Sequence, residues 1–493
     1  MFESAEVGHQ ISREEYKTRV PALREGLLAA QYQLLESAKF PVILIVGGVD
    51  GAGKGETVNL FNEWMDPRHI QTHGFGNPTD EERQRPPMWR FWRALPPKGR
   101  IGMLFGSWYT QPVVDRVCGN TSRSDLIASI EEIRDFEQML VTEGALVVKL
   151  WFHLSKKAQR QRLKDLESDP KTRWRVTETD WERFKNYDKF RKVSEYTLRE
   201  TSTDSAPWMV IEGNDPYYRY LTAGTILLNA LTRRLAQPPK APTPISLLPM
   251  PALDSRNVLN TLDYTQKLGR KVYEEQLEIW QGRLNLLLRD KRFASRSLVA
   301  VFEGQDAAGK GGSIRRITAA LDARRYKVIP VAAPTDEERA KPWLWRFWRH
   351  LPMKGQVTLY DRSWYGRVLV ERVEKFATEA DWMRAYQEIN NFEEQLVRND
   401  IVVVKFWLAI TKDEQLKRFR EREEVSFKNH KITPDDWRNR RKWKAYETAV
   451  CDMVAHTSTE NSPWTLVPSN DVEHARIVVL RTICEAIEAS FNR

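Results

Sequence analysis

The sequence has few cysteines and no long apolar run. Its three cysteines, Cys118, Cys451 and Cys484, share no short spacing, and its eight histidines are scattered. A disulfide framework or a structural zinc site is therefore not expected. No apolar stretch approaches the roughly 18 residues that cross a bilayer, and the first residues, MFESAEVGHQISREEY, lack the basic-then-apolar order of a signal peptide. We expect a cytoplasmic protein without membrane contact.

Charge is plentiful and unbalanced. The 493 residues include 77 lysines and arginines against 67 acidic residues, a formal net charge of +10. This surplus indicates a polyanionic partner such as nucleic acid, a phosphate chain or an acidic membrane, although a merely basic surface has the same composition. The chain is 41% apolar and 29% charged, as in globular proteins, and its length favours two separate cores.

The sequence contains an internal repeat, whose two copies are 256 residues apart. GGVDGAGKGET (47–57) matches EGQDAAGKGGS (303–313), and 12 of 17 residues are identical between 77–93 and 333–349. Six prolines lie between 238 and 251, a density that ends helices and central strands. We therefore predict a first domain over 1–237, a proline-rich linker over 238–255 and a second domain over 256–493.

The pattern within each copy indicates alternating strands and helices. In the second copy, 298–304, 356–361 and 401–410 are short apolar runs typical of strands, and 382–399 has the pattern of a helix. Strands that alternate with helices form parallel sheets covered on both faces. The predicted fold is three-layer α/β/α, once per copy.

A glycine loop that binds phosphate is the clearest motif. Gly304 to Lys310 fits G-x-x-x-x-G-K between an apolar strand and a helix, where backbone N–H groups, the helix dipole and the lysine all favour phosphate. The residue after the lysine is Gly311, where ordinary ATPases and GTPases have Ser or Thr. The predicted phosphate-binding residues of the loop are Gly304, Gly309, Gly311, Gly312 and Ser313.

Two carboxylates accompany the loop. Asp306 lies inside it, and Asp361 ends the next informative strand. Hard oxygen ligands that face phosphates are suited to Mg²⁺, or Mn²⁺, so both are candidate metal ligands. A loop-capping Asx turn is the alternative role for Asp306.

Arginines surround the second carboxylate. DRSWYGRVLVER supplies Arg362, Arg367 and Arg372, whose guanidinium groups match phosphate oxygens, although pairing with surface carboxylates is an equal alternative for Arg372. Arg346 lies in a block that interleaves aromatic and basic residues, PTDEERAKPWLWRFWRHLPMKG. Such a block can stack a base and clamp phosphates, but at helical spacing the aromatic residues more often form core.

Two further segments have open interpretations. Trp364 and Tyr365 recur in the first copy, so core packing is favoured over base stacking. The charged stretch 411–437 is typical of a basic lid that places Lys417, Arg418 and Arg422 near a transferred group. A solvated helix with Glu–Arg pairs has the same sequence pattern.

Taken together, GQDAAGKGGSI, DRSWYGR, the PTDEE…WRFW…LP block and TSTENSPWTLVPSNDVEHAR resemble the polyphosphate kinase 2 family, over nearly all of both copies. The resemblance implies a thymidylate-kinase-like P-loop fold with a helical lid and Mg²⁺-dependent phosphoryl transfer between inorganic polyphosphate and a nucleotide. The duplicated arrangement resembles the fused branch of the family, which implies AMP as acceptor and ADP as product.

The resemblance also implies roles for single residues. Asp306 and Asp361 match the catalytic, metal-linked carboxylates, and Lys310 matches the loop lysine. Arg362 and Arg367 match the arginines around the second carboxylate, and Arg418 and Arg422 match the lid.

The first copy departs from this pattern. Phe105 stands at the position of Asp361, Gly106 at that of Arg362, Gln111 at that of Arg367, Tyr220 at that of Arg476, and Glu56 replaces Gly312. Because a missing phosphoryl-stabilising arginine can alone cost about 10³ to 10⁵ in rate, we predict that the first copy is inactive. Asp50 and Lys54 remain, so retention of phosphate chains by this copy is left open.

Other functions are weighed against this prediction. A nucleoside diphosphate acceptor is an alternative, because pocket depth decides whether the acceptor has one phosphate more or less. Polyphosphate synthesis in the reverse direction is a further alternative. The Asp361–Arg362 pair argues against a regulator that only binds polyphosphate or nucleotide and does not turn it over. Only the net charge favours nucleic-acid binding. The sequence contains no recognisable nucleic-acid-binding motif, so this function is not expected. Association of copies is left open.

Overall fold

The computed structural model describes residues 1–237, 257–424 and 434–492. Contacts divide the chain into two compact units: one holds Met1–Pro78, Arg90–Ala241 and Thr335–Trp345, the other Thr79–Trp89, Pro242–Pro334 and Arg346–Arg493. The predicted linker and part of the predicted lid, residues 425–433, lie outside the described residues. The domain boundaries therefore stay a prediction.

Each copy contains a parallel five-stranded sheet of the same order. The first sheet is ordered β2-β3-β1-β4-β5 and the second β10-β9-β6-β8-β7, so the glycine loop follows the central strand in both. The predicted α/β fold is confirmed. The strands are β1 (Val42–Gly48), β2 (Ile70–Gly74), β3 (Ile101–Phe105), β4 (Leu146–His153), β5 (Trp208–Glu212), β6 (Ser297–Gly304), β7 (Tyr326–Pro330), β8 (Val357–Asp361), β9 (Ile401–Ala409) and β10 (Trp464–Pro468).

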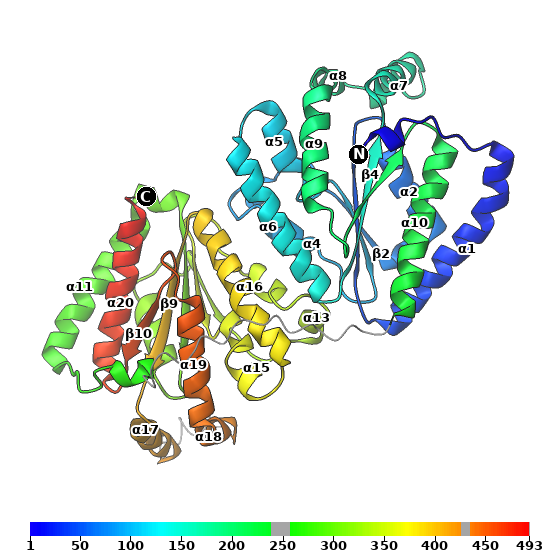
Figure 1. Ribbon diagram of the computed structural model, residues 1–493. Coiled ribbons are helices and arrows are strands. Elements are labelled where there is room, and N and C mark those ends of the chain that lie inside the picture. Colours follow the sequence, from blue (N-terminus) through cyan, green and yellow to red (C-terminus); the bar gives the residue numbers. More distant parts are fainter. Residues whose placement is uncertain (238–256, 425–433, 493) are drawn as a thin grey trace. The chain divides into compact units, whose positions relative to one another are not determined.

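Helices cover both faces of the first sheet (Figure 1). α1, α2 and α10 lie on one face, and α5, α6 and α9 on the other. The helices of this copy are α1 (Arg13–Ser37), α2 (Lys54–Trp64), α3 (Asp80–Arg83), α4 (Trp89–Ala94), α5 (Thr110–Cys118), α6 (Arg123–Thr142), α7 (Lys156–Ser168), α8 (Glu178–Lys185), α9 (Tyr187–Thr201) and α10 (Pro216–Ala236), with 3₁₀ turns η1 (Glu3–Ala5), η2 (Pro67–His69) and η3 (Arg173–Arg175).

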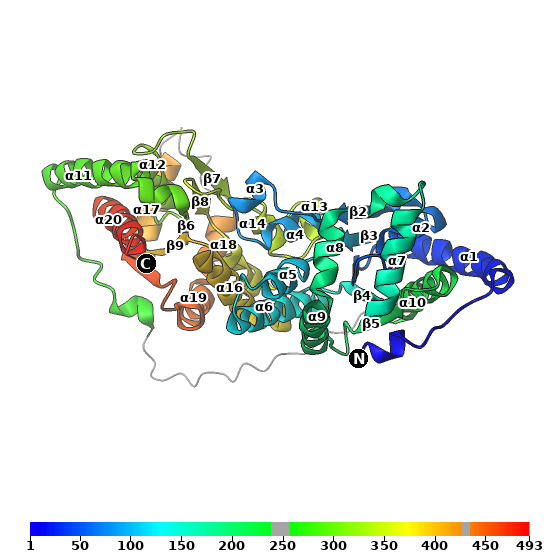
Figure 2. The same cartoon turned by 90° about the horizontal axis from the view of Figure 1, so that it is seen from above.

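The second sheet is covered in the same way. α11, α12 and α20 lie on one face and α15, α16 and α19 on the other; α11 and α20 run side by side in both ribbon views (Figure 2). The helices are α11 (Arg270–Arg289), α12 (Lys310–Thr318), α13 (Asp336–Arg339), α14 (Trp345–Trp348), α15 (Val370–Val373), α16 (Glu379–Arg398), α17 (Lys412–Glu424), α18 (Pro434–Arg441), α19 (Trp443–Thr457) and α20 (Val472–Ser490), with 3₁₀ turns η4 (Val258–Thr261), η5 (Lys291–Ser295) and η6 (Trp364–Arg367).

The central strands explain where the polar chemistry can lie. β6 is buried along its length up to Gly304, as expected for a strand between two helical layers. An unpaired charge inside such a strand would be costly, so charged side chains that meet substrate are expected at its carboxyl end. The described helices include none that is both long and apolar enough to cross a membrane.

A buried ion pair lies beneath the sheet in each copy. In the second copy, Lys405 Nζ lies 2.7 Å from Glu393 Oε2, and both side chains are almost fully buried. Glu393 also accepts hydrogen bonds from Trp364 Nε1 at 3.0 Å and Tyr365 Oη at 2.7 Å. Lys405 Nζ donates to Thr457 O at 2.7 Å. Trp364 and Tyr365 are therefore core residues, as favoured from the sequence.

The first copy repeats this network. Lys149 Nζ lies 2.7 Å from Glu137 Oε2, and Glu137 accepts from Trp108 Nε1 at 3.0 Å and Tyr109 Oη at 2.6 Å. The Ser-Trp-Tyr sequence thus recurs because both copies need the same buried frame.

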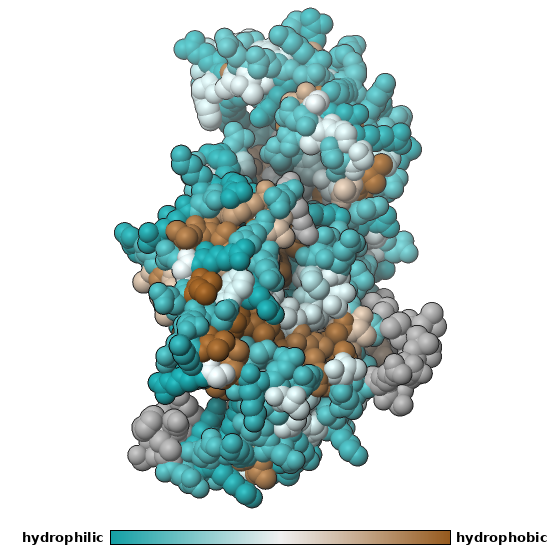
Figure 3. Space-filling view, turned by 90° about the vertical axis from the view of Figure 1, so that its left-hand side faces the viewer, coloured by the Kyte–Doolittle hydropathy of each residue, from teal (hydrophilic) through white to brown (hydrophobic). Residues whose placement is uncertain are grey.

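One apolar stripe stays on the surface. Val272, Ile279 and Leu286 lie seven residues apart on α11 and are 47%, 56% and 71% exposed. Figure 3 looks onto the side of the molecule where α11 lies and shows apolar surface there.

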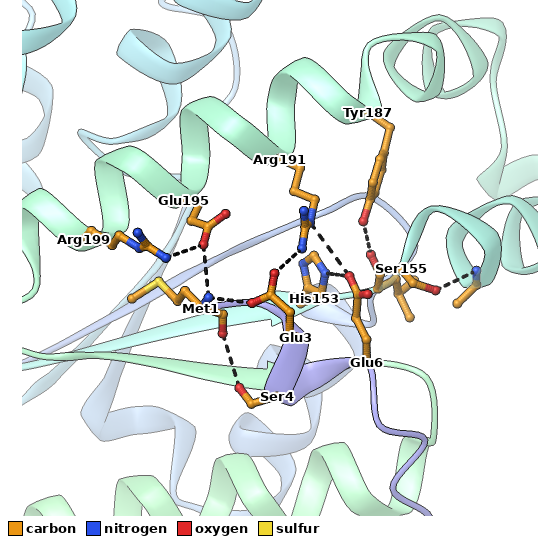
Figure 4. A network of polar contacts seen from close by, with 12 residues as sticks. Met1, Glu3, Ser4, Glu6, His153, Ser155, Tyr187, Arg191, Glu195 and Arg199 are labelled. Carbon is orange, nitrogen blue, oxygen red and sulfur yellow. Dashed lines mark hydrogen bonds and ion pairs between the residues drawn. The ribbon is translucent and has the colours of Figure 1, made fainter.

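The N-terminal segment packs against the carboxyl end of β4. His153 is fully buried, its Nε2 lies 2.8 Å from Glu6 Oε1, and Phe2 stacks on its ring at 4.4 Å. Arg191 on α9 donates to Glu3 at 2.8 Å, so the segment is held by charges that surround the histidine (Figure 4). Burial lowers the pKa of His153, and the nearby Glu6 offsets only part of this effect.

Lys405→Met is expected to destabilise the second unit by about 3–5 kcal/mol, because Glu393 would remain buried without its counter-ion. Lys149→Met should destabilise the first unit to a similar extent. Urea unfolding followed by circular dichroism measures both effects. Lys417→Met, at an exposed site, serves as control, and a loss below about 1 kcal/mol in the two buried variants would contradict a structural role.

Acid is expected to weaken the first unit through His153. Its pKa is lower folded than unfolded, so stability should be full above the ordinary histidine range and fall as the pH drops through the folded value, by at most about 1.4 kcal/mol per pH unit. The free energy of unfolding should depend less on pH in both His153→Gln and His153→Phe. An unchanged pH dependence in both variants would show that another group titrates.

Candidate active site

The glycine loop of the second copy forms a cradle at the end of β6. Gly304 has a φ of +147°, and a Cβ there would collide with the carbonyl oxygen of Leu408. Gly309, with a φ of +103°, directly precedes α12. Lys310 Nζ donates to Gly304 O at 2.8 Å and Gln305 O at 3.1 Å, which folds the side chain back over the loop. Burial lowers the pKa of Lys310.

The rest of the predicted loop residues lie where α12 begins. Ser313 is buried, and Gly311 is exposed. A Cβ on Gly312 would lie 3.4 Å from Nη2 of Arg476, so a basic side chain from α20 approaches the loop.

The two predicted carboxylates both lie at this edge of the sheet. Asp306 Oδ1 lies 2.9 Å from Arg362 Nη2, and its Oδ2 accepts from Asn439 Nδ2 at 2.8 Å. Asp361 ends β8, in register with Phe302 on β6. Both carboxylates act on the pKa of Lys310, so they lie in its electrostatic surroundings.

Arg362 is held by an unusual backbone conformation. Its φ is +65°, in the left-handed region that non-glycine residues rarely adopt, and its N–H donates to Phe302 O at 3.0 Å. The turn directs the side chain toward Asp306. At the equivalent position of the first copy, Gly106 has a φ of +80° and carries no strain.

The lid residues support the loop from α17. Arg418 donates to Ala307 O at 2.9 Å, to Ser469 O at 2.7 Å and to Asn470 O at 2.8 Å, so it fixes the loop backbone. Arg422 is half-buried; burial lowers its pKa, and Asp306 acts on it in the opposite direction. Lys417 is exposed beside Glu421.

Three predicted arginines pair with groups away from the loop. Arg367 lies 3.1 Å from Glu371, and Arg372 lies 2.7 Å from Asp452. Arg346 donates to Ala332 O at 3.0 Å. The carboxylate pairing weighed for Arg372 is thus observed, and phosphate contacts for all three stay predictions.

A hollow adjoins the loop. Its lining combines polar side chains, among them Glu303, Asp306 and Arg362, with apolar and aromatic ones: Leu259, Trp407, Trp443, Tyr446 and Val450. A mixed lining of this kind is typical of sites that bind a small molecule with both apolar and charged groups.

Sequence reasoning missed several of these lining residues. Glu303 and Asn439 could have been found, because the first copy has Gly47 and Arg183 at their positions. Trp443 and Tyr446 gave no such signal, since Tyr187 and Phe190 are also aromatic. Burial raises the pKa of Glu303, which accepts a hydrogen bond from Ser363 at 2.9 Å.

A parallel sheet whose central strand runs into a phosphate loop, with an acidic residue ending the neighbouring strand, defines a P-loop phosphotransferase class. The family model of polyphosphate kinase 2 (PPK2) matches residues 10–239 and 267–493. The chain belongs to the polyphosphate kinase 2 family.

Full-length relatives share this arrangement. The chain is 56% identical to a polyphosphate:AMP phosphotransferase of Pseudomonas aeruginosa, with all of both chains covered. It is 38% identical to one of Acinetobacter johnsonii, over 94% of this chain and 95% of that one. A crystal structure of a polyphosphate kinase 2 from Pseudomonas aeruginosa matches with a TM-score of 0.91 at 54% identity, again over all of both chains.

The strained backbone at Arg362 leads to a stability prediction. Arg362→Gly should be more stable than Arg362→Ala by about 1 kcal/mol, because only glycine adopts this conformation without strain. Both variants lose the ion pair with Asp306, so the difference between their free energies of unfolding reports the backbone strain alone. Thermal unfolding measures it, and equal stability of the two variants would contradict strain at this residue.

Proposed function

We propose that this protein transfers the terminal phosphoryl group of inorganic polyphosphate to AMP, forming ADP, and that the second copy does so alone. Asp361 and Arg362 carry the assignment to the second copy, because Phe105 and Gly106 replace them in the first. The full-length relatives named polyphosphate:AMP phosphotransferase support the acceptor.

Phosphate groups of the donor are held by the loop. The backbone N–H groups at the start of α12 and the ammonium of Lys310 bind terminal phosphate oxygens. A phosphate oxygen of AMP attacks the terminal phosphorus, the bond from that phosphorus to the bridging oxygen breaks, and the shortened chain leaves with the electron pair. Both reactants are anions, so Lys310 and Arg362 favour the transfer by offsetting their repulsion.

Polyphosphate kinase 2 enzymes are metal-dependent phosphotransferases, and we propose Mg²⁺, with Mn²⁺ as a substitute. Among the described residues no group of three His, Cys, Asp or Glu side chains could hold a metal. Two carboxylates, Asp306 and Asp361, nevertheless fit Mg²⁺, which commonly takes one or two carboxylates and completes its shell with phosphate oxygens and water. Bound there, the ion would neutralise charge on the transferred group.

The acceptor occupies the hollow beside the loop. Trp443 and Tyr446 of its lining contact the nucleoside, while Arg362 faces the phosphate of AMP. A diphosphate acceptor is the second candidate, because a GDP-polyphosphate phosphotransferase of Mycolicibacterium smegmatis is 38% identical over 45% of this chain. Polyphosphate synthesis is the same reaction reversed.

The proposed setting is the cytoplasm, with inorganic polyphosphate and AMP or ADP as partners and neither nucleic acid nor membrane involved. Self-association is left open, and the exposed apolar side chains of α11 are its candidate surface.

Matched substitutions in the two copies are expected to affect turnover differently. Asp361→Asn should lower ADP formation from AMP, long-chain polyphosphate and Mg²⁺ by about 10²-fold or more, because charge stabilisation at the transferred group is lost. Asp50→Asn, the matched change in the first copy, should leave the rate within about twofold, well under the 1.4 kcal/mol of a tenfold change.

ADP formation by a coupled assay decides between the alternatives. Activity lost in both variants would contradict a single working copy. ATP from ADP, without ADP from AMP, would favour the diphosphate acceptor, and no transfer to either would favour a binding protein.

A further inference from the structure

We propose that the phosphate loop of the first copy is a second site for inorganic polyphosphate, one that holds the chain without transferring its phosphate. The inference rests on the proposed function only for the identity of the polyanion. All residues of the proposed site belong to the first unit.

The backbone cradle is intact in the first copy. Gly48 has a φ of +139° and Gly53 a φ of +83°, as in the second copy, and α2 begins directly after Gly53. Lys54 Nζ donates to Gly48 O at 2.6 Å. The N–H groups at the start of a helix of 11 residues therefore surround the same kind of concavity.

Positive charge at this loop exceeds negative charge. Two carboxylates, Asp50 and Glu56, lie among five basic side chains, so the cluster carries five positive charges against two negative ones. Asp50 lies 3.4 Å from Lys54 and 3.6 Å from Arg183. Glu56 lies within 3.4 Å of each of three arginines, which come from α7, η3 and α10: Arg162, Arg175 and Arg219.

A buried arginine with an unused donor points at the loop. Arg219 is only 1% exposed, and its guanidinium lies against Gly53, where a Cβ would collide with it. Nη1 donates to Gly213 O at 2.7 Å and Nη2 to Glu56 Oε2 at 2.7 Å, but its buried Nε has no hydrogen-bond partner. A buried N–H without an acceptor is costly, and an anion in the loop would supply one.

The basic surroundings of the loop are kept although the transfer residues are not. Lys54 and Arg162 match Lys310 and Arg418 of the second copy, and Arg183 adds a cation where the second copy has Asn439. The first copy thus lacks the carboxylate and arginine of transfer, replaced by Phe105 and Gly106, but keeps positive charge around its loop. Loss of transfer alone does not explain why this charge is kept.

Glu56 occupies the place that a bound phosphate group would take beside the arginines of the site. Its carboxylate contacts Arg162, Arg175 and Arg219, and its side chain is 32% exposed, which leaves it room to move outward. A phosphate chain would displace it and take over these arginines. Glu56 therefore lowers the affinity of the site, and removing its charge should raise that affinity.

Calorimetric titration with sodium tripolyphosphate tests the proposal in the full chain, without metal and at low salt. Lys310→Ala/Arg362→Ala is the background, because these changes weaken the site of the second copy. In this background we expect one remaining site per chain whose affinity falls steeply with salt, since binding releases counter-ions.

Variants in the first copy should then move the affinity in opposite directions. Adding Lys54→Ala and Arg175→Ala should weaken binding about tenfold or more, and adding Glu56→Gln should tighten it about tenfold, a change of about 1.4 kcal/mol each way. Arg19→Ala, which removes an exposed arginine paired with Glu15, should change nothing.

Loss of binding already in the background, or affinity unchanged by Lys54→Ala/Arg175→Ala, would overturn the proposal. So would a Glu56→Gln variant that is less stable in thermal unfolding yet binds no more tightly, because Glu56 would then serve only to pair Arg219. The titration requires no turnover, so a failure of AMP phosphorylation in the coupled assay would leave these outcomes readable.

Discussion

The buried lysine–carboxylate pair is the interaction on which each copy depends. In the second copy, Glu393 and Lys405 hold Trp364 and Tyr365, which are separated from Asp361 and Arg362 only by Ser363. The charged residues at the sheet edge are thus anchored by a core network two residues away. Taking two charges out of water is costly unless both are well paired, so this network strongly restricts how the strand end can move.

The same frame carries different chemistry in the two copies. Lys149 and Glu137 repeat the pair in the first copy, while the residues just before its Ser-Trp-Tyr segment are Phe105 and Gly106. Side chains at the end of a strand can change with little effect on packing, because they face solvent or substrate. A duplicated fold can therefore keep its core and loop while one copy loses transfer.

Much of the fold could be predicted from the sequence, because strands buried on both faces read as apolar runs and the loop glycines have a fixed spacing. The sequence also predicted that Asp306 and Asp361 face the same phosphates, since strand ends of a parallel sheet share one edge, but it did not predict the ion pair of Asp306 with Arg362. Arginine partners could not be predicted: Arg372 reaches Asp452 on α19, a choice set by tertiary neighbours. The pocket residues Trp443 and Tyr446 were missed because aromatic residues on a helix usually form core.

If transfer takes place in the second copy alone, only the second copy is expected to bind the acceptor. Equilibrium dialysis with radiolabelled AMP tests this most directly, with matched substitutions in the two copies. We expect one AMP per chain, lost in Trp443→Ala/Tyr446→Ala and retained in Tyr187→Ala/Phe190→Ala. Two AMP per chain, or loss of AMP only in the first-copy variant, would contradict the account.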